Sequence, residues 1–252
     1  MRAIDIPLPG PGDGLRVARA QHLRLIDEVN ELAPEQWAAV TECPAWTVRD
    51  MVGHIASVAR FQGNPLLFLV DAQIGRFRYR GRSTLDAANE VGIDRHRSLS
   101  TAELLATLRR RAESDRDTPG WLRRFPAKDE ALPTYTTIGS FVDTILTRDV
   151  WLHRHDIARA VGAATQPDPT DAEVVEQVVR DLGLAWTGPA VHLRLTGPEG
   201  GAWDLGEGAG PEVELPAVEF MRHLSGRTAA PGLLDGVPAE VRGPLAGARV
   251  AF

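Results

Sequence analysis

Two histidines and one aspartate have the types and the spacing needed to bind a metal ion. Asp149 and His153 lie four residues apart in TRDVWLHRHDIARAVG, so on a helix they project from adjacent turns of one face. His54 lies far upstream in CPAWTVRDMVGHIASVARF, also within a helical pattern. Two imidazoles and one carboxylate form a minimal ligand set for a catalytic zinc ion with an open position. Taken alone, the spacing of Asp149 and His153 is more typical of a surface ion pair or of a buried histidine held by an aspartate, because such pairs are common on helices.

Three further residues near these segments invite a chemical interpretation. Asp156 follows His153 by three residues, a spacing suited either to orienting its second ring nitrogen or to a solvated carboxylate. His155 points away from His153 on a helix, which predicts a surface or supporting residue. Cys43 precedes a predicted helix but lies four residues before its cap and is followed by proline, so we interpret it as a turn residue rather than a nucleophile.

Apolar residues at three- and four-residue steps predict the helices that must position these side chains. Thr47 is a good N-cap, and Asp50 three residues later approximates a capping box, so a helix carrying His54 is expected to begin here. The longest predicted helix begins at Thr136 or Thr137, ends at Ala163, and carries Asp149 and His153. Further helices are expected over 15–32, 66–77, 83–115, 170–186 and 216–224. The three prolines of DTPGWLRRFPAKDEALP predict a loop.

The pattern changes after Gly162, where AATQPDPTD has the prolines and short polar residues of a linker. VHLRLTG alternates like a strand, GGAWDLGEG and EVELPA predict two more strands, and AEVRGPLAGARVAF is expected to form a short strand and a turn. The predicted fold class is therefore α+β, mainly α. We expect a helical domain over residues 1–163 and a small α+β domain over residues 164–252.

Composition narrows the class of protein. The 252 residues carry a formal net charge of −6, which gives no global electrostatic case for nucleic-acid binding. A single cysteine excludes an internal disulfide and a cysteine-based zinc finger. The first residues, MRAIDIPLPGPGDG, do not resemble a signal peptide, and no apolar run approaches the roughly 18 residues of a membrane span. We expect a soluble cytoplasmic protein that binds neither nucleic acid nor membrane, as a monomer or a homodimer.

Three motifs in this order resemble the mycothiol-dependent maleylpyruvate isomerase family. They are CPAWTVRDMVGHIA, DVWLHRHDIARAVG, and a C-terminal pattern that joins Gly200-Gly201-Ala202-Trp203 to Ser225-Gly226-Arg227. The resemblance covers nearly the whole chain. It implies an N-terminal four-helix bundle of the DinB/YfiT-like metal-binding type and a C-terminal α+β domain that resembles sterol carrier proteins.

The resemblance also implies a site and a chemistry. The ligands of a divalent metal, usually zinc, would be His54, Asp149 and His153, with Asp156 behind them. Arg227 would serve substrate binding or catalysis. The cosubstrate would be mycothiol or another low-molecular-weight thiol, whose thiolate adds to a small electrophile. The reaction would end as an isomerisation or as an S-transfer. One departure is that Asp149 stands where the family has glutamate, with a side chain one methylene shorter.

Two other functions fit the same residues. One is a hydrolase or lyase that uses a metal hydroxide on the same bundle. The other is a metal- or ligand-binding protein that has lost catalysis, for which the substitution of glutamate by Asp149 is the motivation.

Overall fold

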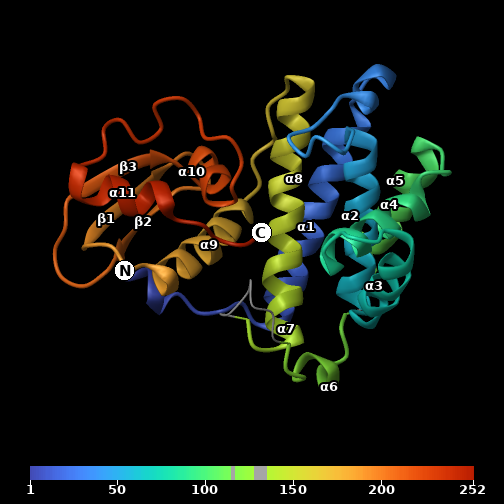
Figure 1. Ribbon diagram of the computed structural model, residues 1–252, viewed down its shortest axis with the longest axis horizontal. Coiled ribbons are helices and arrows are strands. Elements are labelled where there is room, and N and C mark those ends of the chain that lie inside the picture. Colours follow the sequence, from blue (N-terminus) through green and yellow to red (C-terminus); the bar gives the residue numbers. More distant parts are fainter. Residues whose placement is uncertain (115–116, 128–134) are drawn as a thin grey trace. The chain divides into compact units, whose positions relative to one another are not determined.

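The computed structural model describes residues 1–114, 117–127 and 135–252, which form two compact units (Figure 1). The helical unit contains Pro9–Ala127 and Thr136–Gln166. The α+β unit contains Pro167–Phe252, Tyr135 and, in a departure from the predicted range 1–163, Met1–Leu8. The predicted fold class, α+β and mainly α, is confirmed. None of the helices in the described part of the chain is long and apolar enough to cross a membrane.

Hydrogen bonds explain why the first residues join the α+β unit. The Arg180 side chain donates to the carbonyl oxygen of Ile6 at 3.1 Å, and Gln177 donates to that of Pro7 at 2.9 Å. Ala3, in the short 3-10 helix Ala3–Asp5, is fully buried. A proline-rich segment without its own core is thereby fixed by a neighbouring helix.

Four helices of the helical unit enclose its main apolar core. They are α1 (Pro11–Asn30), α2 (Val48–Gly63), α5 (Thr101–Ala112) and α8 (Leu146–Val161). The core combines Leu25 and Ile26 of α1 with Met51 of α2, Leu108 of α5 and Val150 of α8. The same unit contains α3 (Leu66–Arg78), α4 (Thr84–His96), α6 (Gly120–Arg123), α7 (Ile138–Ser140) and the 3-10 helix Pro34–Ala38.

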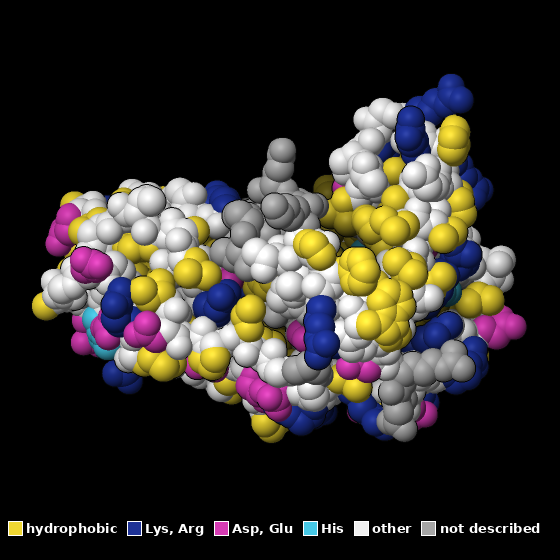
Figure 2. All heavy atoms as spheres, turned by 90° about the horizontal axis from the view of Figure 1, so that it is seen from below, with side chains coloured by type: hydrophobic (Ala, Val, Ile, Leu, Met, Phe, Trp, Pro, Cys, Tyr) yellow, Lys and Arg dark blue, Asp and Glu magenta, His cyan; other side chains and the backbone are white. Residues whose placement is uncertain are grey.

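Helix α3 packs against α4 and keeps part of its apolar surface in solvent. Leu69, Val70 and Phe77 of α3 are more than half exposed, as are Trp121 and Phe125 in and after α6. The space-filling view shows hydrophobic side chains at the surface of the helical unit (Figure 2). The main buried core of this unit is therefore the one among α1, α2, α5 and α8.

The start of α2 follows the sequence prediction. Thr47 Oγ1 accepts from the Asp50 amide at 3.2 Å, and Asp50 Oδ2 accepts from the Thr47 amide at 3.1 Å. This capping box satisfies two amide donors, which would otherwise be unpaired at the start of the helix. The cap fixes where the helix begins, and hence the direction in which His54 points.

Two helix predictions need correction. The segment 83–115 forms two helices rather than one, because Ser100 caps a new helix through Glu103 after α4 has ended. The segment expected to continue without interruption to Ala163 contains a π-helical turn, Phe141–Ile145, between α7 and α8. A π turn is invisible to an analysis that assumes 3.6 residues per turn.

Two segments predicted to lack helix contain some. The expected loop 117–133 includes the helical turn α6, while its residues 128–133 lie outside the described part of the chain. The expected C-terminal strand is instead α11 (Ala239–Gly247). Val241 and Leu245, four residues apart, are both fully buried, so one helical face supplies the apolar contacts that were assigned to a strand.

The α+β unit holds the three predicted strands in one sheet. β1 (Val191–Thr196) lies between β2 (Gly201–Leu205), which is antiparallel to it, and β3 (Glu212–Pro216), which is parallel. One face is apolar because alternate residues of each strand are buried, among them Leu193, Trp203 and Val213. The helices of this unit are α9 (Asp171–Ala185), α10 (Ala217–Leu224) and α11.

Candidate metal centre

The structure brings His54 of α2 together with Asp149 and His153 of α8. His54 Nε2 lies 3.0 Å from Asp149 Oδ2, and His153 Nε2 lies 3.3 Å from Asp149 Oδ1. One nitrogen or oxygen atom from each residue lies within 4.8 Å of the other two. Both histidines are only 4% exposed, and the Asp149 side chain is 20% exposed. Three donor atoms therefore lie close together on largely buried side chains.

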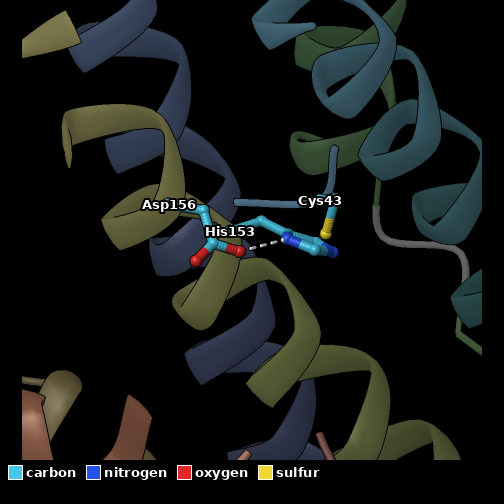
Figure 3. Close-up of side chains that lie close together, drawn as sticks. All are labelled: Cys43, His153 and Asp156. Atoms are coloured by element: carbon cyan, nitrogen blue, oxygen red, sulfur yellow. Dashed lines mark hydrogen bonds and ion pairs between the residues drawn. The ribbon is translucent and has the colours of Figure 1, made fainter. Parts of the chain in front are cut away.

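Asp156 fixes the orientation of the His153 ring. Its Oδ2 atom lies 2.9 Å from His153 Nδ1, and its side chain is fully buried (Figure 3). A carboxylate can only accept, so Nδ1 carries the proton and Nε2 is turned toward Asp149. Histidines that bind metals are commonly held in this way by a carboxylate behind them.

Trp46 packs over both imidazoles, a contact that the sequence analysis missed. Its ring centroid is 4.9 Å from that of His54 and 6.1 Å from that of His153. The indole N–H points to Glu90 Oε1 at 3.3 Å, and Arg82 donates to the same oxygen at 2.8 Å. The only signal in the sequence is the position of Trp46 directly before the N-cap, where a side chain can fold back over the first turns of its helix.

The electrostatics of the cluster favour an ionised carboxylate. Burial alone would raise the pKa of Asp149, but the charges of His54 and His153 and their hydrogen bonds outweigh it and hold this pKa well below its usual range. Burial alone would lower the pKa of His153, but the Asp149 charge and the hydrogen bonds to Asp149 and Asp156 raise it to about 9. The negative charge in this core thus attracts a cation, and a bound metal ion would displace the His153 proton.

Cys43 lies closer to this cluster than its interpretation as a turn residue implied. It does shape the turn, since the Trp46 amide donates to its carbonyl oxygen at 2.8 Å. Its Sγ atom is also within 4.8 Å of a ring nitrogen of His153 and a carboxylate oxygen of Asp156. Figure 3 shows the thiol beside the His153 ring. No spacing rule connects Cys43 with α8, so the sequence alone gave no sign of this contact.

His155 and Arg227 are not part of the cluster of three. His155 is buried with its ring 4.3 Å from that of Trp151, so the surface position considered for it is wrong. Arg227 belongs to the α+β unit, one residue after Gly226, whose φ is +84°. Its backbone amide donates to the carbonyl oxygen of Arg222 at 3.1 Å. The role of Arg227 stays a prediction.

Comparisons with known proteins agree with this architecture. Residues 18–158 match the family model described as the mycothiol maleylpyruvate isomerase N-terminal domain. No curated protein matches the chain significantly. Two solved structures are similar to it: the mycothiol-dependent maleylpyruvate isomerase, with a TM-score of 0.53, and a histidine-to-alanine mutant of that enzyme, with a TM-score of 0.52. Each is 16% identical and aligns over 91% of this chain and 93% of its own.

At that identity the likeness to the two crystal structures concerns the fold alone. The family model is a different kind of match, because it covers more than half of the chain and includes both α2 and most of α8. The chain therefore belongs to the mycothiol maleylpyruvate isomerase family of enzymes.

Proposed function

We propose that this protein is a metal-dependent enzyme that uses a low-molecular-weight thiol, such as mycothiol, to isomerise a small electrophile or to transfer sulfur to it. The observation that carries the proposal is the convergence of His54, Asp149 and His153 within 4.8 Å. Membership of the family supports the thiol and the isomerase chemistry. We place the enzyme in the cytoplasm, as a monomer or a homodimer that acts on small molecules.

The donor set fits a divalent ion, with Zn²⁺ the best match. Two imidazole nitrogens and one carboxylate are typical of catalytic zinc sites with an open position. Asp149 directs one oxygen to each histidine, which supports its role as a ligand despite its short side chain. The Nδ1 atom of His54 is buried and has no hydrogen-bond partner among the described residues, so on this side the ring is held by packing against Trp46, without a second carboxylate behind it.

When bound, the divalent ion would lower the pKa of a thiol and favour its thiolate form. The protein supplies the rest of the environment. Asp156 keeps His153 in the tautomer that leaves Nε2 available. Trp46 packs against both imidazoles, and the burial of these rings strengthens electrostatic interactions in the core. Arg227 is our candidate for binding a carboxylate of the substrate, for which a guanidinium group offers a bidentate geometry.

In an isomerisation of this class, the thiol adds to a conjugated double bond and later leaves. The added sulfur makes the former double bond single, rotation follows, and elimination restores both the double bond and the thiol. The thiol is then regenerated, so the enzyme needs no oxidant or reductant. In an S-transfer the sulfur stays on the product and the thiol is consumed.

Metal content tests the first half of the proposal. Protein purified without added zinc is expected to carry about one divalent ion per chain by elemental analysis, and His54→Ala is expected to lose it while remaining folded by circular dichroism. His192→Ala is the matched control, because His192 forms a comparable pair with Asp204 at 2.7 Å on the exposed side of β1. A folded wild-type protein that neither contains nor binds a divalent ion would contradict the proposal.

Thiol dependence tests the second half. Turnover of model electrophiles such as cis-configured conjugated oxo acids is expected only when a thiol is added. A rate indifferent to thiol would favour the hydrolase or lyase that uses a metal hydroxide. Thermal stabilisation by thiol and electrophile without any turnover would identify a binding protein instead.

A further inference from the structure

A third histidine, His22 of α1, carries a nitrogen that nothing in the described part of the chain satisfies. His22 is 1% exposed, and its Nδ1 lies 2.7 Å from the carbonyl oxygen of Ala18. A carbonyl oxygen accepts, so Nδ1 holds the proton and Nε2 has the free lone pair. Nε2 is buried and without a hydrogen-bond partner. Buried polar atoms are nearly always satisfied, so an orphaned acceptor points to a water molecule or a ligand.

His22 faces the same core as the three candidate ligands. Leu25 and Ile26, three and four residues further along α1, are buried in the cluster that includes Met51 and Ile55 of α2. His54 lies between those two residues of α2 in the sequence. Val150, which directly follows Asp149, belongs to the same cluster. The inward face of α1 is therefore directed at the part of the core that contains the candidate metal centre.

Contacts between α1 and α8 place His22 at the level of that centre. A Cβ atom on Gly14 would lie 2.5 Å from Asp143 Cβ, and further along, Arg154 Nη1 donates to Gln21 Oε1 at 2.6 Å. The two helices thus run in the same direction. At about 1.5 Å per residue, His22 lies about 12 Å along α1 from Gly14. Asp149 and His153 lie about 9 and 15 Å along α8 from Asp143, so His22 stands at a height between these two candidate ligands.

The charge state of His22 agrees with a role as an acceptor. Burial lowers the pKa of His22 to about 4, although the hydrogen bond to Ala18 and the nearby Asp149 charge partly oppose the shift. The imidazole is neutral at physiological pH. The opposing effect of the Asp149 charge agrees with a position of His22 on the same side of the core as that carboxylate.

We propose that His22 Nε2 accepts a hydrogen bond from a small protonated ligand, a thiol or a water molecule, that enters the core beside Asp149. This inference rests on the proposed function, because it concerns the ligand-binding side of the same centre. His22 is a positioning residue: it orients the S–H or O–H donor and does not itself form a bond to the substrate. Its lone pair accepts only from a protonated donor, so His22 would contact the thiol in its neutral form, before a bound metal ion favours the thiolate.

Nuclear magnetic resonance of the full chain with ¹⁵N-labelled histidine tests the inference directly. The His22 Nε2 shift reports whether an unprotonated nitrogen accepts a hydrogen bond. A hydrogen-bonded shift in protein without thiol identifies water as the donor. A change from an unbonded to a hydrogen-bonded shift on adding Zn²⁺ and 2-mercaptoethanol identifies the thiol. An unbonded shift under every condition would overturn the inference.

A pair of variants provides an independent readout. His22→Leu is expected to weaken the binding of 2-mercaptoethanol to the zinc-loaded protein about tenfold and to leave zinc content unchanged, since one hydrogen bond is lost. His96→Leu is the matched control, because His96 of α4 is buried and also bonds through Nδ1 to the carbonyl oxygen four residues earlier, at 2.8 Å. Equal thiol binding by both variants and the wild type would rule out a thiol as the donor.

The two proposals fail in different ways. If the wild-type protein binds no metal, the proposed enzyme function is wrong, while the His22 Nε2 shift in metal-free protein still shows whether water is held there. If metal and thiol bind normally and the Nε2 atom stays unbonded, the enzyme function stands and only the role of His22 is wrong.

Discussion

Helix α8 carries two buried polar clusters that differ in how completely their atoms are paired. Arg154 is fully buried and donates to both carboxylate oxygens of Glu28, at 3.0 and 2.8 Å. It also donates to Gln21 Oε1 at 2.6 Å and to the carbonyl oxygen of Gln166 at 2.8 Å. Every guanidinium nitrogen has an acceptor. This cluster fixes α8 to α1 and to the segment that follows α8.

The cluster around Asp149 lies about one turn away and is not fully paired. One carboxylate contacts two imidazoles, and within the described part of the chain neither the Nδ1 atom of His54 nor the Nε2 atom of His22 on α1 has a hydrogen-bond partner. When every polar atom of a buried cluster has a hydrogen-bond partner, the cluster is held in a single geometry. When some polar atoms lack a partner, they are still able to bind a ligand or a metal ion. The contrast therefore separates the residues that hold the bundle together from those that we assign to function.

The largest expected effect comes from breaking the complete cluster. Arg154→Leu leaves the Glu28 carboxylate without its main partner, so the free energy of unfolding is expected to fall by about 3–5 kcal/mol in denaturant titrations. Zinc content per folded chain is expected to stay unchanged. Arg109→Leu is the control, because Arg109 is half exposed and its contacts with Asp27 and Glu113 are 3.9 and 3.8 Å long. Similar losses in both variants would remove the distinction between the clusters.

The incomplete cluster is expected to lose stability in acid through His22. Its pKa is about 4 in the folded protein and 6.5 in an unfolded chain, so below pH 6.5 the unfolded state takes up a proton that the folded state does not. The free energy of unfolding should fall by roughly 3 kcal/mol between pH 6.5 and 4, at about 1.36 kcal/mol per pKa unit. His22→Leu should lack this part of the decline in metal-free protein. Parallel pH profiles for wild type and variant would contradict the assignment.

Asp156→Asn sharpens the comparison from the metal side. The amide keeps the shape of the side chain but no longer holds the Nδ1 proton of His153 as a charged acceptor. Zinc affinity is expected to fall about 10–100-fold in chelator competition, which corresponds to about 1.4–2.8 kcal/mol. Asp204→Asn, in the exposed pair with His192, is expected to leave zinc affinity unchanged. An unchanged affinity in Asp156→Asn would show that Asp156 supports only the fold.

The smallest expected effect concerns the cap that begins α2. Thr47→Ala removes the acceptor for the Asp50 amide and should lower the free energy of unfolding by about 1 kcal/mol. Ser83→Ala removes the corresponding cap of α4, which carries none of the candidate ligands. Both variants should lose similar stability. A selective loss of zinc affinity in Thr47→Ala would show that the cap also positions His54.

Local patterns predicted much of the frame that holds the candidate centre. The capping box at Thr47 and the alternation of apolar and polar residues in the three strands each depend on residues that are close together in the sequence. The structure contains both the capping box and the three strands. The pairing of His54 with residues of α8 was expected from a family resemblance, because no local rule connects two helices so far apart. Whether these residues bind a metal stays a prediction.

The contacts that the sequence analysis missed all depend on how separate segments pack. Cys43 was assigned to a turn, and nothing in the sequence of that turn shows that Cys43 and the nearby Trp46 lie against α8. His22 lies in the apolar pattern of α1, but that pattern alone does not show which part of α8 lies opposite it. The strand expected at the C-terminus was wrong because Val241 and Leu245 fit either period over so short a segment.

The π-helical turn Phe141–Ile145 has a consequence for how this chain can vary in length. A π turn accommodates one residue more than an α-helical turn, so it is the form that a single-residue insertion takes inside a helix. Without it, residues before the turn would rotate by about 100° relative to those after it. The bulge lies ahead of Asp149, His153 and Asp156, so the spacing of these three is untouched by it. Related chains that differ here by one residue can therefore keep the same ligand geometry, and alignments should place the gap in this turn.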